Sequence, residues 1–369
     1  MMTRTLRYAL WTVAILGMAG YVMLAGHGLL YPQSGDSLDA AVLQQAVNIT
    51  ENRLPLADPA QSPGVALMPV APFVVSVLVQ LFDAQPWEPA LVGLLAILLV
   101  AALASVVVAK ETESVTLGVS AAAFLLMGQR ISQGEVVMNC PQSLFLLLAL
   151  AGCFVLRYTR GIAGTLLASV TIATACFTHP SGLWFAFAAM LHLAVHDKRR
   201  AVICALAFAV LVGGGQFAMT RLLGEGFNLH AWQIPARLAW FQPVGLLILL
   251  GSQLLGTLGV LTLASVLAFA LPVRPWQGAG GLWTWIGFAA LGAAMLATQS
   301  LAPSPDALPP AIVAFAIVGP ISIQRLVKHL SAWPGSSRKA GQNVVLTAIA
   351  LQFVMLLAHV APSLPGAAM

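Results

Sequence analysis

The stretch YPQSGDSLDAAVLQQ, residues 31–45, places two carboxylates three residues apart directly after the first apolar run of the chain. Asp36 stands where an N-cap residue precedes a helix, and Asp39 falls in the first turn, where the helix dipole favours a negative charge. Apolar residues then recur at helical spacing, at Leu38, Val42, Ala46 and Ile49. The stretch therefore predicts an amphipathic helix over residues 37–50 that lies along a membrane surface.

The composition around this stretch is that of an integral membrane protein. Of the 369 residues, 59% are hydrophobic and 8% are charged, whereas soluble domains contain about 25% charged residues. The formal net charge is +5, but the basic residues lie in short loops between apolar runs, where they set the orientation in the membrane. We therefore expect no nucleic-acid partner.

The first apolar run, residues 6–30, follows Arg4 and Arg7. A transmembrane helix needs about 20 apolar residues, and the apolar part of a signal peptide has only about 7–15. The run is long enough to span, so we expect a retained anchor with the N-terminus in the cytoplasm.

Further apolar runs fill most of the chain. They lie at residues 66–82, 89–109, 115–129, 142–157, 162–178, 180–196, 201–219, 243–271, 281–299, 309–324 and 342–361. The basic loops between them all face the cytoplasm only if one run before Lys110 does not cross. The run at 66–82 opens with MPVAP and is short, so we expect it to lie in the outer interface or to be re-entrant. About eleven crossings then remain, with the C-terminus outside.

These expectations define an all-α fold, a polytopic transmembrane helical bundle made of a single transmembrane domain, residues 1–369. The first extracytoplasmic loop, residues 31–88, carries amphipathic juxtamembrane helices, and residues 89–361 hold the remaining transmembrane helices. No soluble C-terminal domain is expected. Nearly all acidic residues fall in the outer loops, so an active or binding site is expected on the extracytoplasmic face. The glycine run at 213–215 indicates close helix packing or a local bend.

The outer loops carry motifs similar to those of a known superfamily. GDSLDAAVLQQAVNITENRLP (35–55) resembles the first outer loop of the GT-C glycosyltransferases, with an aspartate before a surface helix. SPGVALMPVAP (62–72) resembles their proline-rich element before a span, and SQGEVVMN (132–139) and THPSG (178–182) are similar to the second acidic loop and the polar turn of bacterial members. The likeness is to polyprenol-phosphate-mannose-dependent mannosyltransferases and, more distantly, to aminoarabinose and protein O-mannosyl transferases.

The resemblance implies an enzyme of the bacterial inner membrane that moves a sugar from a polyprenyl-phosphate donor to a lipid, glycan or protein acceptor. Such a transfer needs a carboxylate to accept the proton of the acceptor hydroxyl and cations to stabilise the departing phosphate. Asp36 is the expected base, with Asp39 and Glu135 as further catalytic carboxylates. Asp36 and Glu135 together could hold a divalent cation, and no other cofactor is expected.

The cations of the outer face are the expected ligands of the phosphate. They are Arg130, His179, Arg221, His230 and Arg237. Arginine suits this role because its guanidinium binds phosphate through two parallel hydrogen bonds. For Arg221 and Arg237 an equally good interpretation is that they anchor helix ends in the membrane interface.

Two other functions remain open. A transporter or flippase for a lipid or small solute would bury ionisable or helix-breaking groups near mid-membrane. The apolar runs here are nearly free of charge at their centres and show no internal repeat, which favours chemistry at one membrane face. A non-catalytic relative that serves envelope assembly is the third interpretation.

Overall fold

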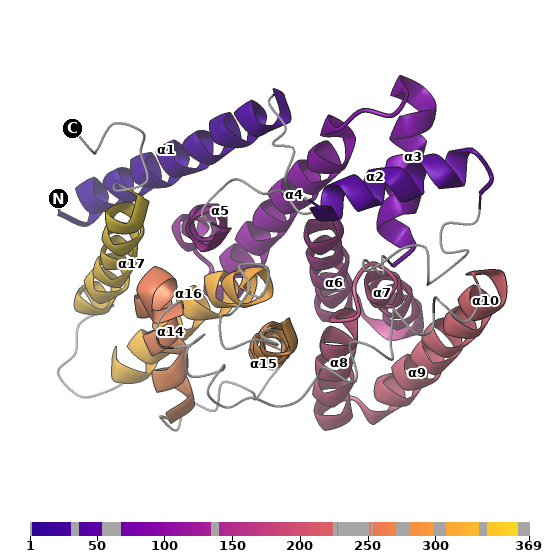
Figure 1. The fold of residues 1–369 in the computed structure, drawn as a ribbon. Helices are drawn as coiled ribbons and strands as arrows, with labels where there is room; N and C mark the ends of the chain where they lie inside the picture. Colours follow the sequence, from indigo (N-terminus) through magenta and orange to yellow (C-terminus); the bar gives the residue numbers. More distant parts are fainter. Residues whose placement is uncertain are drawn as a thin grey trace. The chain divides into compact units, whose positions relative to one another are not determined.

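The computed structural model describes residues 2–30, 37–53, 68–133, 140–223, 254–270, 280–297, 308–331 and 338–360, together with residues 227 and 251. These residues form helices joined by short turns, and they contain no strand (Figure 1). The all-α prediction is therefore confirmed.

The chain divides into two compact units. The first-loop unit comprises Ala25–Val100 and Val137–Phe241, and the C-terminal unit comprises Met1–Leu24, Ala101–Val136 and Gln242–Met369. Helices α1 (Met2–Leu30) and α4 (Trp87–Thr112) contribute residues to both units.

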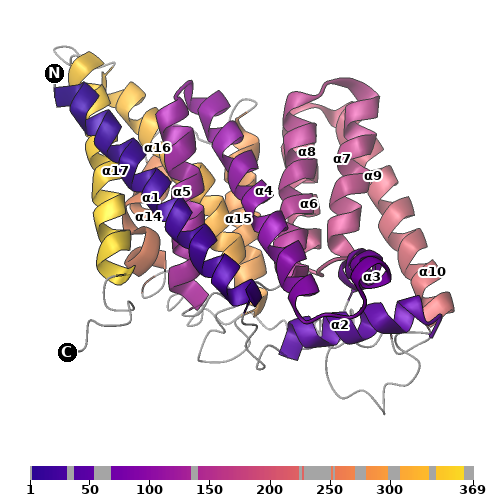
Figure 2. The ribbon, with the colours of Figure 1, turned by 90° about the horizontal axis from the view of Figure 1, so that it is seen from above.

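The first-loop unit is a group of neighbouring helices with two shorter helices across one end. Its helices are α2 (Ser37–Thr50), α3 (Val70–Phe82), α6 (Cys140–Tyr158), α7 (Gly161–Cys176), α8 (Gly182–His196), α9 (Lys198–Phe208), the π-helical turn η1 (Ala209–Gly213) and α10 (Gly214–Leu223). Helix α6 packs on α7, and α7 packs on α8 and α9. Figure 2 shows α2 and α3 running across the direction of α6, α7 and α8 at one end of these helices.

The apolar face of α2 is covered by protein. Val42 and Ala46 have no exposed surface and pack with Ala71 and Val75 of α3 and with Cys140, the first residue of α6. The predicted helix over residues 37–50 is confirmed, but the face expected to meet the membrane is buried against α3 and α6. The small side chains at these positions let the helices approach closely.

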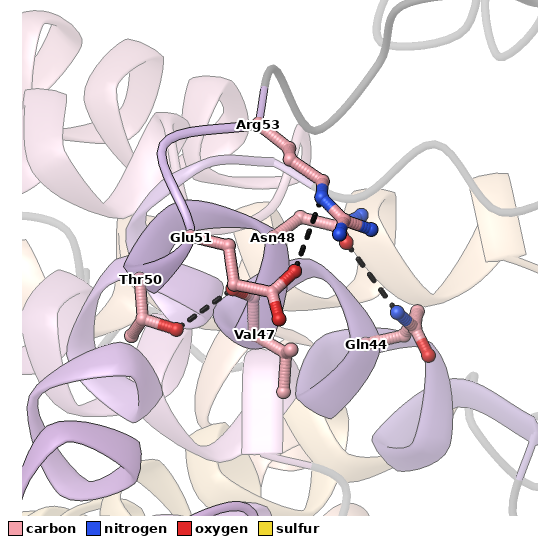
Figure 3. Close-up of polar contacts among 6 residues, drawn as sticks. All are labelled: Gln44, Val47, Asn48, Thr50, Glu51 and Arg53. Atoms are coloured by element: carbon pink, nitrogen blue, oxygen red, sulfur yellow. Dashed lines mark hydrogen bonds and ion pairs between the residues drawn. The ribbon is translucent and has the colours of Figure 1, made fainter.

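Polar contacts at the surface surround the C-terminal end of α2. Thr50 donates a 2.7 Å hydrogen bond to the carbonyl of Val47, and Arg53 forms an exposed ion pair of 3.2 Å with Glu51 (Figure 3). Asn52 has a φ of 54°, a left-handed conformation that ends the helix.

Helix α3 fits the expectation for residues 66–82. It has 13 residues, which extend about 20 Å at ~1.5 Å per residue, less than the hydrocarbon core of about 30 Å. Helix α3 is therefore shorter than the hydrocarbon core, and its place in the outer interface or as a re-entrant segment stays a prediction. Pro69 directly precedes its first residue.

The C-terminal unit is built around one buried helix. Its helices are α5 (Val115–Gln133), α14 (Leu255–Ala270), α15 (Gly281–Ala297), α16 (Pro309–Ser331) and α17 (Arg338–Val360), with parts of α1 and α4. Helix α16 contacts α5, α14, α15 and α17, and every residue from Leu308 to Ile323 is buried. The Trp283 indole of α15 donates a 3.1 Å hydrogen bond to Glu111 in the part of α4 that belongs to this unit.

Helix α14 is broken at Leu258, where φ is −121° and ψ is 38°. The fully buried Gln352 of α17 forms hydrogen bonds with backbone groups at this break. Its Oε1 accepts hydrogen bonds from the backbone N–H groups of Val260 (3.1 Å) and Leu261 (3.4 Å), and its Nε2 donates to the carbonyl of Thr257 at 2.7 Å. Backbone groups at this break are thus hydrogen-bonded by a side chain of the protein.

Among the residues that the structure describes, six helices are long and apolar enough to cross a membrane. They are Arg4–Leu30, Trp87–Thr112, Cys140–Tyr158, Lys198–Leu222, Pro309–His329 and Ala340–Ala358. Other apolar helices, α7 and α8 among them, are shorter. The chain is a multi-pass membrane protein, and the count of about eleven crossings stays a prediction.

Candidate functional site

One residue of the predicted site, Asp39, links two helices at the end of the first-loop unit where α2 and α3 lie. Asp39, in the first turn of α2, accepts a 3.0 Å hydrogen bond through Oδ1 from the backbone N–H of Cys140. Cys140 begins α6, so the carboxylate serves a helix N-terminus other than its own, where the dipole also favours a negative charge. Asp39 therefore fixes α2 on α6.

The turn between α7 and α8 lies at the same end. The backbone N–H of Val70, the first residue of α3, donates a 3.2 Å hydrogen bond to the carbonyl of Phe177. Gly215 of α10 faces the Phe177 ring so closely that a Cβ there would lie 2.6 Å from Cζ. Contacts from α3 and α10 thus hold this turn; within the glycine run only Gly215 packs closely, and, among the described residues, Gly213 and Gly214 have open space around them.

His179 is half-buried in this turn. Its ring centroid lies 5.4 Å from that of Phe145 in α6, and Nδ1 accepts a 3.2 Å hydrogen bond from the backbone N–H of Ser181. Burial lowers the pKa of the His179 imidazole to about 4. The side chain is neutral at pH 7 and offers hydrogen bonding there, but no charge, to a phosphate.

The structure describes the other predicted site residues to different extents. Arg221 is exposed in the last turn of α10, with Cζ 5.2 Å from the centre of the Phe217 ring. For Arg130, the structure describes only the backbone, in α5. Four residues lie outside the described residues: Asp36, Glu135, His230 and Arg237.

One residue that the sequence did not single out is Glu88, in the first turn of α4. The side chain has no exposed surface, and neither carboxylate oxygen has a hydrogen-bond partner among the described residues. One turn further along α4, Val92 packs against the cluster of α2, α3 and α6. A buried polar group without a partner costs stability, and such groups gather at functional sites. The only sequence signal was an acidic residue at the start of a long apolar run.

A metal centre finds no support in the described part of the chain. No three histidine, cysteine, aspartate or glutamate side chains gather there in a way that could hold a metal ion. The predicted pair of Asp36 and Glu135 lies outside these residues, so a divalent cation held by this pair stays a prediction.

No protein-family model matches the sequence, and no curated protein sequence is similar to it.

The structure is similar to two solved membrane glycosyltransferases. The first is the oligosaccharyltransferase AglB from Archaeoglobus fulgidus, in complex with an inhibitory peptide and a dolichol-phosphate. It has a TM-score of 0.56 and 14% identity over 96% of this chain, and this chain spans 56% of the length of AglB. The second is ArnT from Cupriavidus metallidurans bound to undecaprenyl phosphate, with a TM-score of 0.54 and 12% identity over 94% of this chain and 76% of ArnT. Both belong to the GT-C superfamily, so this chain has the fold of the GT-C membrane glycosyltransferases.

Proposed function

We propose that this protein is a membrane glycosyltransferase that moves a sugar from a polyprenyl-phosphate carrier to an acceptor on the extracytoplasmic face. One observation carries the proposal: nearly the whole chain shares its fold with two glycosyltransferases whose structures contain dolichol-phosphate and undecaprenyl phosphate. The acceptor is a lipid, a glycan or a protein; AglB was solved with an inhibitory peptide. The protein would reside in the bacterial inner membrane with its N-terminus in the cytoplasm.

In the proposed reaction the acceptor hydroxyl attacks the anomeric carbon of the donor sugar. A new carbon–oxygen bond forms, the bond to the phosphate oxygen breaks, and polyprenyl phosphate leaves with the bonding electron pair. Asp36 accepts the hydroxyl proton, and Glu135 would assist it in orienting the acceptor. Arg130, Arg221, His230 and Arg237 are the proposed partners of the phosphate, and His179 would add a neutral hydrogen bond.

Asp39 has a different role in this proposal. Its hydrogen bond to Cys140 fastens the first turn of α2 to α6, and Asp36 directly precedes α2 in the sequence. The contact supports Asp39 as a positioning residue that holds the segment bearing the base. A divalent cation between Asp36 and Glu135 is the alternative role for that pair, and removing it with a chelator would then stop the transfer.

The test is sugar transfer by the purified protein in nanodiscs, offered a panel of polyprenyl-phosphate sugars. The Asp36→Asn variant keeps the size of the side chain and removes its basicity. We expect a loss of about 10²–10⁴-fold in transfer rate. Asp83→Asn is the matched control, because Asp83 is an exposed aspartate of the same outer loop. Full activity of Asp36→Asn would refute the base, and no transfer from any donor would refute the enzyme.

A further inference from the structure

We propose that the end of the first-loop unit away from α2 and α3 binds the phosphate of an anionic membrane lipid. This end holds the turn between α6 and α7 and the turn between α8 and α9 (Figure 2). Helix α6 has 19 residues from Cys140 onward, about 28 Å at ~1.5 Å per residue, close to the about 30 Å of a hydrocarbon core. The two ends thus face opposite membrane surfaces, and this proposal does not rest on sugar transfer.

Basic side chains gather at this end. We call the surface that these side chains form the basic end. Its residues are Arg157, Arg160, His196, Lys198 and Arg199. All of them are exposed except Arg157, which is half-buried. Asp197 is the only carboxylate between residues 157 and 200, and its Oδ1 accepts a hydrogen bond from the backbone N–H of Arg200 at 3.1 Å. The basic end therefore carries a net positive charge, which favours the binding of an anion.

Arg200 connects the helices that meet at the basic end. Its Nε donates to the hydroxyl of Thr165 at 2.8 Å, and its guanidinium also donates to the carbonyl groups of Leu156 (3.1 Å) and Thr159 (3.3 Å). These bonds tie the start of α9 to the end of α6 and to the first turns of α7. The segments that carry Arg160, Lys198 and Arg199 are thus held in place by Arg200, whose Nε and Nη2 already donate to protein groups.

His192 supplies the observation that points to a ligand. Its side chain is 7% exposed, and its Nδ1 has no hydrogen-bond partner among the described residues. The ring lies 4.6 Å from that of His196, and Arg157 and Arg200 lie close enough for their charges to act on it. A buried ring nitrogen costs stability without a partner. Because Nδ1 is closed from the surface, the ring would turn to donate a hydrogen bond from an imidazole N–H to a phosphate oxygen beside these cations.

The surroundings select a lipid rather than free phosphate. Next to His196 in the sequence, Val195 is 65% exposed, and one turn after Lys198, Val202 is 58% exposed. Ile162, two residues after Arg160, is also exposed. A head group at the basic end would therefore have apolar side chains beside it for its acyl chains, and cations at the ends of helices bind anionic head groups in this way.

Native mass spectrometry of the detergent-purified protein tests the proposal, with phosphatidylglycerol and phosphatidylcholine of equal chain length as probes. We expect selective binding of phosphatidylglycerol. The Lys198→Gln/Arg199→Gln double variant should weaken it about 30-fold, at roughly a fivefold effect per cation. Arg4→Gln/Arg7→Gln is the matched control, since these two exposed cations lie on α1 at the same predicted membrane face, and it should leave the affinity within about twofold.

The variants His192→Gln and His192→Phe distinguish a specific lipid-binding site from nonspecific electrostatic attraction. Gln retains a side-chain donor and should keep part of the affinity, whereas Phe should lose it while the melting temperature shows that the protein is folded. Equal binding of both lipids, an equal effect of both double variants, or an unchanged affinity in His192→Phe would overturn the proposal. Displacement of the lipid by millimolar inorganic phosphate would assign the site to free phosphate and would overturn the choice of a lipid.

Discussion

Asp39 of α2 and Cys140 of α6 are joined by a 3.0 Å hydrogen bond from the backbone N–H of Cys140 to the Asp39 carboxylate. The bond links two segments 101 residues apart in the chain. It brings an acidic side chain to the N-terminus of a long apolar helix, where unpaired backbone N–H groups need acceptors.

We expect Asp39→Ala to lower the free energy of unfolding by about 1–2 kcal/mol, the usual loss for a removed helix cap. Asp39→Asn should lose less, because the amide oxygen can still accept from Cys140. Thermal unfolding in detergent measures both. Glu51→Ala, at an exposed carboxylate whose surface ion pair contributes only about 0–1 kcal/mol, is the control, and an Asp39→Ala variant as stable as the parent would show that the bond contributes nothing.

Replacing Glu88 by methionine should stabilise the protein. The buried carboxylate has no partner among the described residues, which costs about 1–3 kcal/mol, and losing a charge in the first turn of a helix costs only about 0.3–1 kcal/mol. Chemical or thermal unfolding should therefore show a net gain in Glu88→Met.

Glu51→Met provides the comparison for that variant. Glu51 is exposed and paired with Arg53 at 3.2 Å, and such surface pairs contribute only about 0–1 kcal/mol. This variant should show no gain. If Glu88→Met loses stability instead, the carboxylate is satisfied by groups outside the described residues. Sugar transfer by Glu88→Met then reports whether the carboxyl also serves the reaction.

The stability of the protein should fall as the pH is lowered from about 6.5 to 4. The pKa of His179 is about 4 in the folded state and about 6.5 in an unfolded chain. Between these values the unfolded state binds a proton that the folded state does not, so acid favours unfolding, by up to about 3 kcal/mol at pH 4. Above pH 6.5 this contribution is constant.

Melting temperatures of the parent and of His179→Gln between pH 4 and 7.5 test this pH dependence. The variant should show a shallower slope over the same window, because its side chain does not titrate. Identical slopes would mean that other groups cause the acid sensitivity and that His179 is already protonated in the folded protein.

Gln352→Leu should destabilise the protein by about 2–4 kcal/mol. The substitution removes the hydrogen bonds of Gln352 to two backbone N–H groups and one carbonyl at the break near Leu258, and a buried group that loses its hydrogen bond costs about 1–3 kcal/mol before relaxation. Gln80→Leu, at an exposed position of α3, should change the melting temperature little. A small effect of Gln352→Leu would mean that α14 closes its own break by refolding.

The helices of the first outer loop were predictable because their signals are local. Asp39 and the i, i+4 apolar pattern lie within residues 37–50, and the short run with its prolines marked α3. What covers the apolar face of α2 was not predictable, since Val42 and Ala46 suit a membrane surface and a protein surface equally well. The partner surface comes from α3 and from Cys140, about a hundred residues away, and only the tertiary fold brings it there.

The chemistry of individual site residues was harder to predict for the same reason. The sequence offers His179 as a cation for phosphate, whereas burial in the folded protein, with Phe145 of another helix against its ring, lowers its pKa to about 4 and leaves it neutral. Arg200 looked like one of three adjacent basic residues, and only its contacts with Leu156, Thr159 and Thr165 distinguish it as a structural residue. Burial and hydrogen bonding by distant segments decide these roles, and a single sequence does not encode them in any local pattern.

The π-helical turn Ala209–Gly213 sets the rotational phase of α10, which follows it directly. A π-turn accommodates one residue more than an α-turn, and each residue of an α-helix advances by about 100°. If the turn relaxed to α-helix, Gly214 would replace Gly215 against the Phe177 ring, with no side chain to obstruct the exchange. The glycine run thus makes two phases of α10 compatible with one packing contact, and passing between them would swing Arg221 by about a quarter of a turn around the helix axis.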